Sequence, residues 1–241
     1  MLLDKTEIGR IKSSKHVVFF TGAGISAESG IPTFRGEGGI WNKLKPEELA
    51  NFNAFMKNPA MVWEWYNYRR KIIKESQPNA GHFAIAGFQD YFSRVTVITQ
   101  NIDNLHERAG SREIFELHGN IERNYCIKCK TFYNEIIENS EIPKCKCGGL
   151  IRPDVVWFGE LLPEDQFDQS EKAASECDLF FVVGTSAVVY PAASLIYTAK
   201  QHGAYIFEVN IKETEISSFA HKTLIGKAGI LLPQILSELQ N

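Results

Sequence analysis

The sequence contains no run of apolar residues long enough to cross a membrane, and no large excess of charge of one sign. A spanning helix needs about 20 consecutive apolar residues. The formal net charge is −3, which argues against bulk electrostatic binding to nucleic acid. The first 16 residues mix charged and apolar side chains, unlike a secretion signal. We therefore predict a cytoplasmic protein for which neither a membrane nor nucleic acid is an expected partner.

Cysteine is scarce, and four of the five cysteines lie between positions 126 and 147. An odd number clustered in this way is a poor basis for disulfides and a good basis for a metal site. Cys126 and Cys129 form one close pair, and Cys145 and Cys147 form the other. Two such pairs around a short insert are typical of a structural zinc held by four thiolates. The second pair has one intervening residue where two are usual, which leaves the geometry of that half open.

The most informative stretch runs from His16 to Arg35. It begins with a β-branched and aromatic run at 17–20, which is typical of a strand buried on both faces. A glycine turn at 22–24 follows and, with Ala27, makes a G-x-G-x-x-A spacing. Small residues there let the backbone approach a diphosphate, and a helix that starts after the turn offers free N–H groups to the phosphates. Glycine-rich turns are common, so this spacing alone leaves a purely structural role equally open.

The segment after this turn differs from the plain helix of an ordinary dinucleotide-binding fold. Gly30 and Pro32 would interrupt such a helix, and Phe34 and Arg35 then place an aromatic ring and a guanidinium in a loop. The glycines at 36–39 mark a further loop, which could close over a ligand or serve as a flexible surface connection. These features favour a ligand-binding role for the turn.

Polar or small residues follow three other predicted strands. They are Gln100, Asn101 and Asp103 after 94–99, Gly184, Thr185 and Ser186 after 178–183, and Asn210 after 204–209. Open α/β sheets bind ligands at the carboxyl ends of parallel strands, so we expect these residues to line one site. An Asx cap at Asp103 or Asn104 is the alternative reading of that segment, and both can hold.

His118 lies at the end of another predicted strand, which begins at residue 113. A lone histidine is more often structural than catalytic, but this one falls at a ligand-facing strand end. A neutral imidazole with a pKa near 6.5 suits general-base catalysis at neutral pH. His106 is the rival, although it lies inside a predicted helix. His82 is expected only to start the helix at 83–92.

Residues 46–77 are predicted to be helical, and Tyr66 and Arg69 stand three apart on the same helix face. A phenol beside a guanidinium is a good receptor for a small carboxylate. The simpler alternative is an arginine on a solvated face, and the residues alone favour that alternative.

Four segments resemble the sirtuins, the NAD-dependent protein deacylases. They are GAGISAESGIPTFRG at 22–36, TQNIDNLHERAG at 99–110, HGN at 118–120 and WFGE at 157–160. The resemblance implies that His118 is the catalytic base and that Asn101 and Asp103 hold the nicotinamide and its ribose. The residues that it implies for NAD binding are Gly22, Ala23, Gly24, Ser26, Glu28, Phe34, Arg35, Gln100, Asn101, Ile102, Asp103, Gly184, Thr185, Ser186, Asn210 and Ala228.

For Tyr66 and Arg69, the same resemblance favours the carboxylate receptor over an arginine on a solvated face. Y-x-x-R in this helix is similar to the motif of sirtuins that remove succinyl and malonyl groups, and Ala50 is a weaker match to their small pocket residue. The acylated lysine would enter on an extended peptide that pairs with free backbone groups. The residues expected to contact this substrate are Tyr66, Arg69, Val156, Phe158, Gly159, Glu160 and Val188.

The implied reaction consumes NAD as a co-substrate. The acyl oxygen attacks the anomeric carbon of the nicotinamide ribose, nicotinamide leaves, and His118 then deprotonates a ribose hydroxyl that attacks the acyl carbon. Hydrolysis gives free lysine and 2′-O-acyl-ADP-ribose. Two alternatives stay open: an NAD-dependent protein ADP-ribosyltransferase, and a non-catalytic sensor of NAD or ADP-ribose.

The implied fold is α/β, with a Rossmann-type parallel sheet and a small lobe made of a helical insertion and the four-cysteine zinc module. The 241 residues, 44% of them hydrophobic, would form one catalytic unit. The expected boundaries are 1–35, 81–121 and 151–241 for the Rossmann lobe, with 36–80 (helical) and 122–150 (zinc-binding) for the small lobe. We expect 151–160 to return to the parallel sheet and a terminal helix over 232–240.

Overall fold

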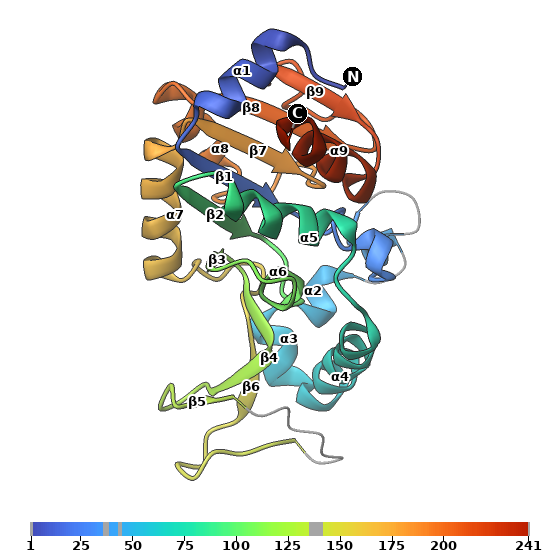
Figure 1. The fold of residues 1–241 in the computed structure, drawn as a ribbon. Coiled ribbons are helices and arrows are strands. Elements are labelled where there is room, and N and C mark those ends of the chain that lie inside the picture. The colour runs from blue at the N-terminus through green and yellow to red at the C-terminus, as the bar shows by residue number, and fades with distance from the viewer. Residues whose placement is uncertain (1, 36–38, 43–44, 135–141, 241) are drawn as a thin grey trace.

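The computed structural model describes residues 2–35, 39–42, 45–134 and 142–240, arranged as a large and a small lobe (Figure 1). The large lobe holds a six-stranded sheet whose order is β3-β2-β1-β7-β8-β9, with every neighbouring pair parallel. Its strands are β1 (His16–Thr21), β2 (Arg94–Thr99), β3 (Glu113–Glu116), β7 (Leu179–Val183), β8 (Tyr205–Asn210) and β9 (Lys222–Ile225). This order confirms the Rossmann-type prediction. Strand β9 was not predicted, because it is a short, half-exposed edge strand without a clear apolar pattern.

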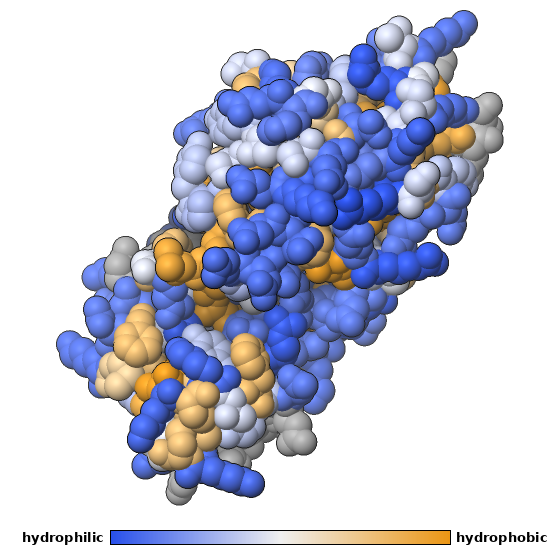
Figure 2. All heavy atoms as spheres, turned by 90° about the vertical axis from the view of Figure 1, so that its left-hand side faces the viewer, coloured by the Kyte–Doolittle hydropathy of each residue, from blue (hydrophilic) through white to orange (hydrophobic). Residues whose placement is uncertain are grey.

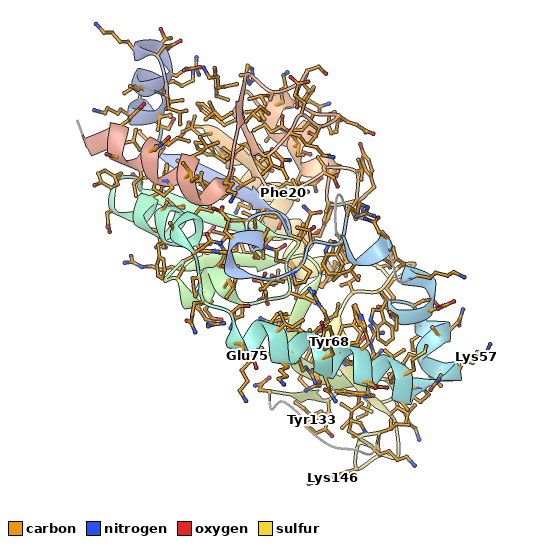
Figure 3. All side chains as sticks on the ribbon, turned by 90° about the vertical axis from the view of Figure 1, so that its right-hand side faces the viewer. Phe20, Lys57, Tyr68, Glu75, Tyr133 and Lys146 are labelled. Atoms are coloured by element: carbon orange, nitrogen blue, oxygen red, sulfur yellow. The ribbon has the colours of Figure 1, made fainter. Side chains whose placement is uncertain are left out.

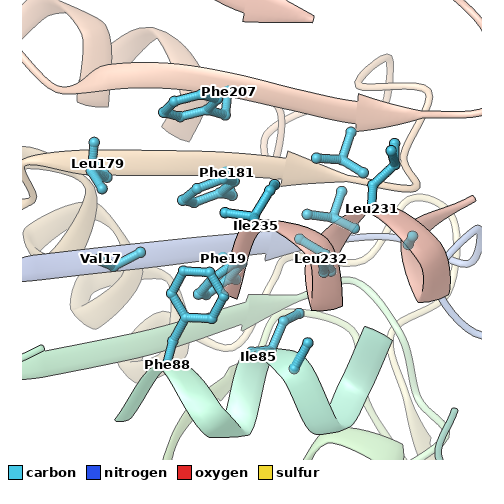
Figure 4. Close-up of a cluster of buried hydrophobic side chains, with 14 of the residues drawn as sticks. Val17, Phe19, Ile85, Phe88, Leu179, Phe181, Phe207, Leu231, Leu232 and Ile235 are labelled. Atoms are coloured by element: carbon cyan, nitrogen blue, oxygen red, sulfur yellow. The ribbon is translucent and has the colours of Figure 1, made fainter. Parts of the chain in front are cut away.

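Helices cover both faces of this sheet. They are α1 (Lys5–Ser13), α5 (Ala80–Gly87) and α9 (Ala228–Gln240) on one face, and α7 (Glu164–Glu176) and α8 (Ser194–Gln201) on the other. Successive side chains of a strand point to opposite faces, so Val17 and Phe19 face one helical layer while Val18 and Phe20 face the other. Both faces are buried, which is why all four residues are apolar. In the first layer, the rings of Phe19 and Phe181 stack with centroids 4.9 Å apart, beneath the aliphatic residues of α5 and α9 (Figure 4).

Helix α9 starts a turn earlier than predicted, at Ala228 instead of residue 232. The Glu28 carboxylate accepts the N–H of Gly229 at 2.8 Å, and this contact satisfies a donor in the first turn of the helix. Pro233 therefore lies inside the helix. A cap supplied from a segment about 200 residues away leaves no local signal in the sequence.

The small lobe combines three helices with a three-stranded antiparallel sheet. The helices are α2 (Pro46–Leu49), α3 (Phe52–Lys57) and α4 (Pro59–Glu75), and the strands, in the order β5-β4-β6, are β5 (Phe132–Tyr133), β4 (Gly119–Cys126) and β6 (Ile151–Val155). Figure 3 shows α4 along this lobe, with Tyr68 near its middle and Glu75 at its end. Asn58 caps α4 by accepting the N–H of Met61 at 3.2 Å, and Pro59 is its first residue.

The expectation that residues 151–160 return to the parallel sheet is wrong. Residues 151–155 form β6 and pair with β4, with Cys126 opposite Ile151 and Gly119 opposite Val155, and residues 156–160 belong to no strand. The two strands flank the cysteine insert, so the chain that leaves the insert runs back beside the chain that entered it. Val156 lies just beyond β6, and its N–H donates to the His118 carbonyl at 3.0 Å. No helix among the described residues has the length and apolar character needed to cross a bilayer.

Candidate active site and metal centre

The glycine turn packs directly against the loop after β7. The N–H groups of Gly22 and Gly24 donate to the carbonyls of Val183 and Gly184 at 3.0 and 2.8 Å. A Cβ at position 24 would lie 2.6 Å from the Gly184 oxygen, so the glycines permit this close approach of two backbones. The predicted helix start after the turn is corrected: only a single 3₁₀ turn, η1 (Ala27–Ser29), forms there. Gly30, at φ +85°, follows this turn and ends it.

Ser26, Asn101 and Asp103 form one buried hydrogen-bonded group. Ser26 Oγ donates to Asp103 Oδ2 at 2.7 Å, and Asn101 Nδ2 donates to Ser26 Oγ at 3.2 Å and to the Gly22 carbonyl at 3.1 Å. Asp103 Oδ1 accepts the N–H of Leu105 at 3.1 Å in an Asx turn that leads into α6 (Leu105–Arg108), whereas the N-cap residue Asn104 makes no side-chain cap hydrogen bond. Burial raises the pKa of Asp103, and its hydrogen bonds oppose that shift. Three residues predicted for the dinucleotide therefore meet at the ends of β1 and β2.

The ends of β7 and β8 join the same edge. Gln100 Nε2 donates to Thr185 Oγ1 at 3.0 Å, and Asn210 Nδ2 donates to the Thr185 carbonyl at 2.8 Å. Gly184 and Ser186 flank Thr185 in this loop. The carboxyl ends of four neighbouring strands thus present polar side chains at one edge of the sheet, where open α/β folds bind ligands.

His118 lies beside this edge, half-buried, with Nδ1 2.9 Å from the Gln100 carbonyl. A carbonyl only accepts, so Nδ1 carries a proton and Nε2 keeps its lone pair. Nε2 has no hydrogen-bond partner among the described residues. Burial lowers the pKa of His118 below 6.5, and the hydrogen bond to Gln100 opposes this less strongly. The ring is therefore neutral at pH 7, in the form that a general base requires.

Two further histidines lie beside the buried group; sequence reasoning gave His82 no chemical role and considered His106 only as a rival to His118. The rings of His82 and His106 are 4.9 Å apart, with His82 Nε2 3.4 Å from Ser26 Oγ and His106 Nε2 2.9 Å from Thr21 Oγ1. The helix predicted over 83–92 begins earlier, as α5 at Ala80, so His82 lies within its first turn, where Nδ1 accepts the N–H of the capping residue Asn79 at 3.3 Å. Burial lowers both pKa values, that of His82 to about 4.

Other residues that were predicted to bind the dinucleotide do not belong to this group of polar side chains at the strand ends. The Glu28 side chain is exposed and bound to Gly229, and Ala228 is the buried first residue of α9. Arg35 is exposed, and Ile102 is buried in the core of the small lobe. Phe34 lies under the guanidinium of Arg69, whose carbon is 5.2 Å from the ring centroid. The mobile-loop prediction for 36–39 falls largely outside the described residues.

Tyr66 and Arg69 are both buried, which excludes the solvated-face alternative for the arginine. The Tyr66 hydroxyl accepts a hydrogen bond from Trp157 Nε1 at 2.7 Å, and burial raises the pKa of the phenol. Arg69 is 2% exposed, yet its Nε and Nη1 have no hydrogen-bond partner among the described residues. Ala50 packs in the same core. A buried guanidinium with free donors is a costly arrangement unless an acceptor arrives.

The segment after β6 borders this core. Phe158 and Val188 are partly exposed, and the N–H of Phe158 donates to the Ala50 carbonyl at 2.9 Å. The Glu160 carboxylate is held by Arg152 and by the N–H of Trp157, and Gly159 takes a left-handed φ of +85°. The side chain of Glu160 therefore stabilises the segment itself. On the face shown in Figure 2, hydrophobic residues are exposed in a band across the middle of the molecule.

The four clustered cysteines converge as predicted. Their Sγ atoms all lie within 4.8 Å of one another, and none of the four forms a disulfide. A tetrahedral zinc with Zn–S bonds of about 2.3 Å fits such a spacing. The N–H of Lys128 donates to Cys126 Sγ at 3.4 Å, and the Tyr133 hydroxyl donates to Cys145 Sγ at 3.0 Å, as suits thiolates. The short Cys145–Cys147 spacing thus still brings both sulfurs to the cluster.

The fold and these sites together define a dinucleotide-binding α/β enzyme with a zinc-binding lobe. Residues 22–191 match the Sir2 family. The chain is 49% identical to "NAD-dependent protein deacylase 2" of Pyrobaculum aerophilum, over 95% of this chain and 93% of that protein. A solved Sir2 homolog–NAD complex superposes with a TM-score of 0.92 at 44% identity, covering 99% of this chain and 94% of the other. The chain belongs to the Sir2 family.

Another solved relative is described as a complex of Sir2, a p53 peptide and NAD⁺. It matches with a TM-score of 0.87 at 33% identity, over 97% of each chain. An "NAD-dependent protein deacylase 1" of Caldanaerobacter subterraneus is 52% identical over 88% of this chain and 89% of its own length. The resemblance drawn from the four sequence segments is thereby confirmed at the level of the family.

Proposed function

We propose that this chain is an NAD-dependent protein-lysine deacylase that prefers acyl groups ending in a carboxylate, such as succinyl and malonyl. Family membership and the names of the relatives support the deacylase activity. The acyl preference is carried by one observation: Arg69 is buried with two nitrogens unpaired among the described residues. A carboxylate is the ligand that would satisfy them, through charge-assisted hydrogen bonds.

The roles of the remaining residues follow from their chemistry. His118 is the base, because its Nε2 lone pair is free and its ring is neutral at pH 7. Asn101 and Asp103 would hold the nicotinamide end of NAD, supported by Ser26. Bringing the weakly nucleophilic acyl oxygen to the ribose is chiefly a matter of proximity and of excluding water. We expect the acyl-lysine to arrive on an extended peptide beside 156–160 and Val188, and the enzyme to act in the cytoplasm.

The lobes are proposed to keep the sequence-derived boundaries, with one adjustment. Strand β6 pairs with β4, so the small lobe would extend from about residue 119 to residue 155 in place of 122–150. The four cysteines would hold one zinc in a closed site with no open position, so the metal would stabilise the lobe and take no part in the reaction.

Removing the Arg69 guanidinium tests the acyl preference. In Arg69→Met, we expect kcat/KM for a succinyl-lysine peptide to fall about 10- to 100-fold, because hydrogen bonds to charged groups contribute about 1.5–3 kcal/mol. The acetyl-lysine peptide should change less than about 3-fold. Both peptides are measured by mass spectrometry of NAD-dependent turnover.

Lys71→Met is the matched control, because Lys71 is exposed on the same helix and its loss removes the same charge. It should leave both activities unchanged. Succinyl turnover that survives undiminished in Arg69→Met would contradict the proposed role of this residue.

A further inference from the structure

Trp157 is almost fully buried and donates its indole N–H to the Tyr66 hydroxyl at 2.7 Å. An indole N–H can only donate, so the Tyr66 oxygen must accept this bond. The single proton of the phenol is then directed elsewhere. No acceptor for that proton is found among the described residues, and burial raises the pKa of Tyr66, which keeps the phenol protonated. Tyr66 is thus held as a hydrogen-bond donor.

Trp157 is itself fixed from its other side. The guanidinium carbon of Arg152 lies 3.2 Å from the indole centroid, and Arg152 pairs with the Glu160 carboxylate. Glu160 Oε2 also accepts the backbone N–H of Trp157 at 2.8 Å. Arg152 is 1% exposed and donates further to the Val155 carbonyl at 2.6 Å. The cation–π contact holds the indole ring, and the charge-assisted hydrogen bonds hold Arg152 in place against it.

We propose that Trp157 is a positioning residue for the acyl group: it orients the Tyr66 hydroxyl so that its proton points to the carboxylate bound by Arg69. This rests on the proposed preference for carboxylate-ended acyl groups. Trp157 does not contact the substrate in this role. It acts through Tyr66, and the Arg152–Glu160 pair acts through Trp157.

The same arrangement connects the core around Tyr66 to the segment after β6. Trp157 is followed by Phe158, whose N–H donates to the carbonyl of Ala50 in that core. The segment expected to pair with the peptide backbone therefore carries the indole that orients Tyr66 and is hydrogen-bonded to the same core. The segment that would pair with the peptide backbone and the residues that would bind the acyl carboxylate are therefore connected by hydrogen bonds.

The test is a double-mutant cycle of Trp157→Phe and Tyr66→Phe with succinyl and acetyl peptides. Trp157→Phe keeps a buried ring but removes the N–H. We expect KM for the succinyl peptide to rise about 3- to 10-fold with kcat nearly unchanged, as loss of one neutral hydrogen bond predicts. The acetyl peptide should change less than 2-fold. In the Tyr66→Phe background, Trp157→Phe should add no further loss of succinyl selectivity.

Trp63→Phe is the matched control, because Trp63 is a buried indole of the same lobe that donates to the Ile151 carbonyl and not to Tyr66. It should leave the ratio of succinyl to acetyl activity unchanged. If Trp157→Phe does not fold, benzothienylalanine at position 157 replaces the N–H by sulfur and keeps the bicyclic shape. The indole ¹⁵N–¹H resonance of Trp157, assigned by its loss in Trp157→Phe, should shift in Tyr66→Phe.

The outcomes separate the two proposals. If Tyr66→Phe and Arg69→Met lower succinyl selectivity while both position-157 variants leave it intact, the role of Trp157 is wrong and the acyl preference stands. Equal losses on both peptides at position 157, or losses additive with Tyr66→Phe, also overturn that role. If neither Tyr66→Phe nor Arg69→Met alters selectivity, the acyl preference is wrong and the role of Trp157 falls with it.

Discussion

The two lobes are stabilised by different means. The parallel sheet of the large lobe lies between two helical layers, and both of its faces are filled by buried aliphatic and aromatic side chains. The sheet of the small lobe has three strands, one of them only two residues long, and its core includes Cys126 and Cys145. Among the described residues between β4 and β6, 127–134 and 142–150, only Cys145 and Gly149 are buried, so apolar burial contributes little at the cysteine end. The comparison indicates that the cysteine end of the small lobe depends on its metal, whereas the large lobe depends on apolar burial.

The largest effect is expected from chelation of the metal, which should unfold one lobe and not the other. Structural zinc contributes about 10–16 kcal/mol of folding free energy in small zinc modules. We expect a zinc chelator to unfold the cysteine end, abolish deacylation, and leave a separate cooperative transition from the large lobe in thermal unfolding. Cys145→Ser should behave in the same way without chelator.

Cys177→Ala provides the control for that experiment, because Cys177 is a buried thiol of the large-lobe core outside the cluster. It should retain one zinc per chain by elemental analysis and keep full activity. A single transition that is unaffected by zinc removal would show that the two lobes are not stabilised separately.

The second prediction concerns His118, at the edge between the lobes. In His118→Ala we expect deacylation to fall about 10²- to 10⁴-fold, the range for loss of a general base. The base acts after nicotinamide has left, so exchange of labelled nicotinamide into NAD should persist while product formation stops. Loss of both reactions together, with an unchanged melting curve, would place the role of His118 before bond cleavage.

The pH dependence of activity also tests whether His118 is the general base. Because the pKa of His118 is lowered from 6.5, the base is already neutral at pH 7. We expect wild-type kcat/KM to be flat near neutrality and to fall only at a pH below 6.5. A decline that sets in above pH 7 would indicate that a different group titrates.

The smallest effect is expected from the buried His82 of the large lobe. Its pKa is about 4 in the fold against 6.5 when exposed, so the unfolded chain binds the proton first as the pH falls. Stability is therefore lost on acidification, by about 1 kcal/mol between pH 6.5 and 5.5 for this residue. Urea unfolding of wild type and His82→Gln at both pH values measures how much of the loss in unfolding free energy comes from His82. An equal loss in the two proteins would contradict the prediction.

Much of the fold follows from local patterns in the sequence. The apolar run at 17–20, the glycine turn and the polar residues after the strands predict a parallel sheet with a ligand edge, because burial on both faces requires such runs. The spacing of the four cysteines predicts the metal cluster for a similar reason: tetrahedral thiolate ligation needs close pairs. The glycines at 22 and 24 predict a close approach of the backbone to another group, and in the structure that group is the loop at Gly184.

The sequence by itself determined the chemistry that is available: the imidazole, the thiolates, and the phenol and guanidinium three residues apart on a helix. Only the tertiary structure decided the pairing of β6 with β4, the early start of α9 at the Glu28 carboxylate, and the burial of His82 and His106. It also decided that the Trp157 indole meets Tyr66 and that two Arg69 nitrogens stay unpaired among the described residues. These outcomes depend on contacts between segments far apart in the chain, and periodicity and turn signals report only on neighbours.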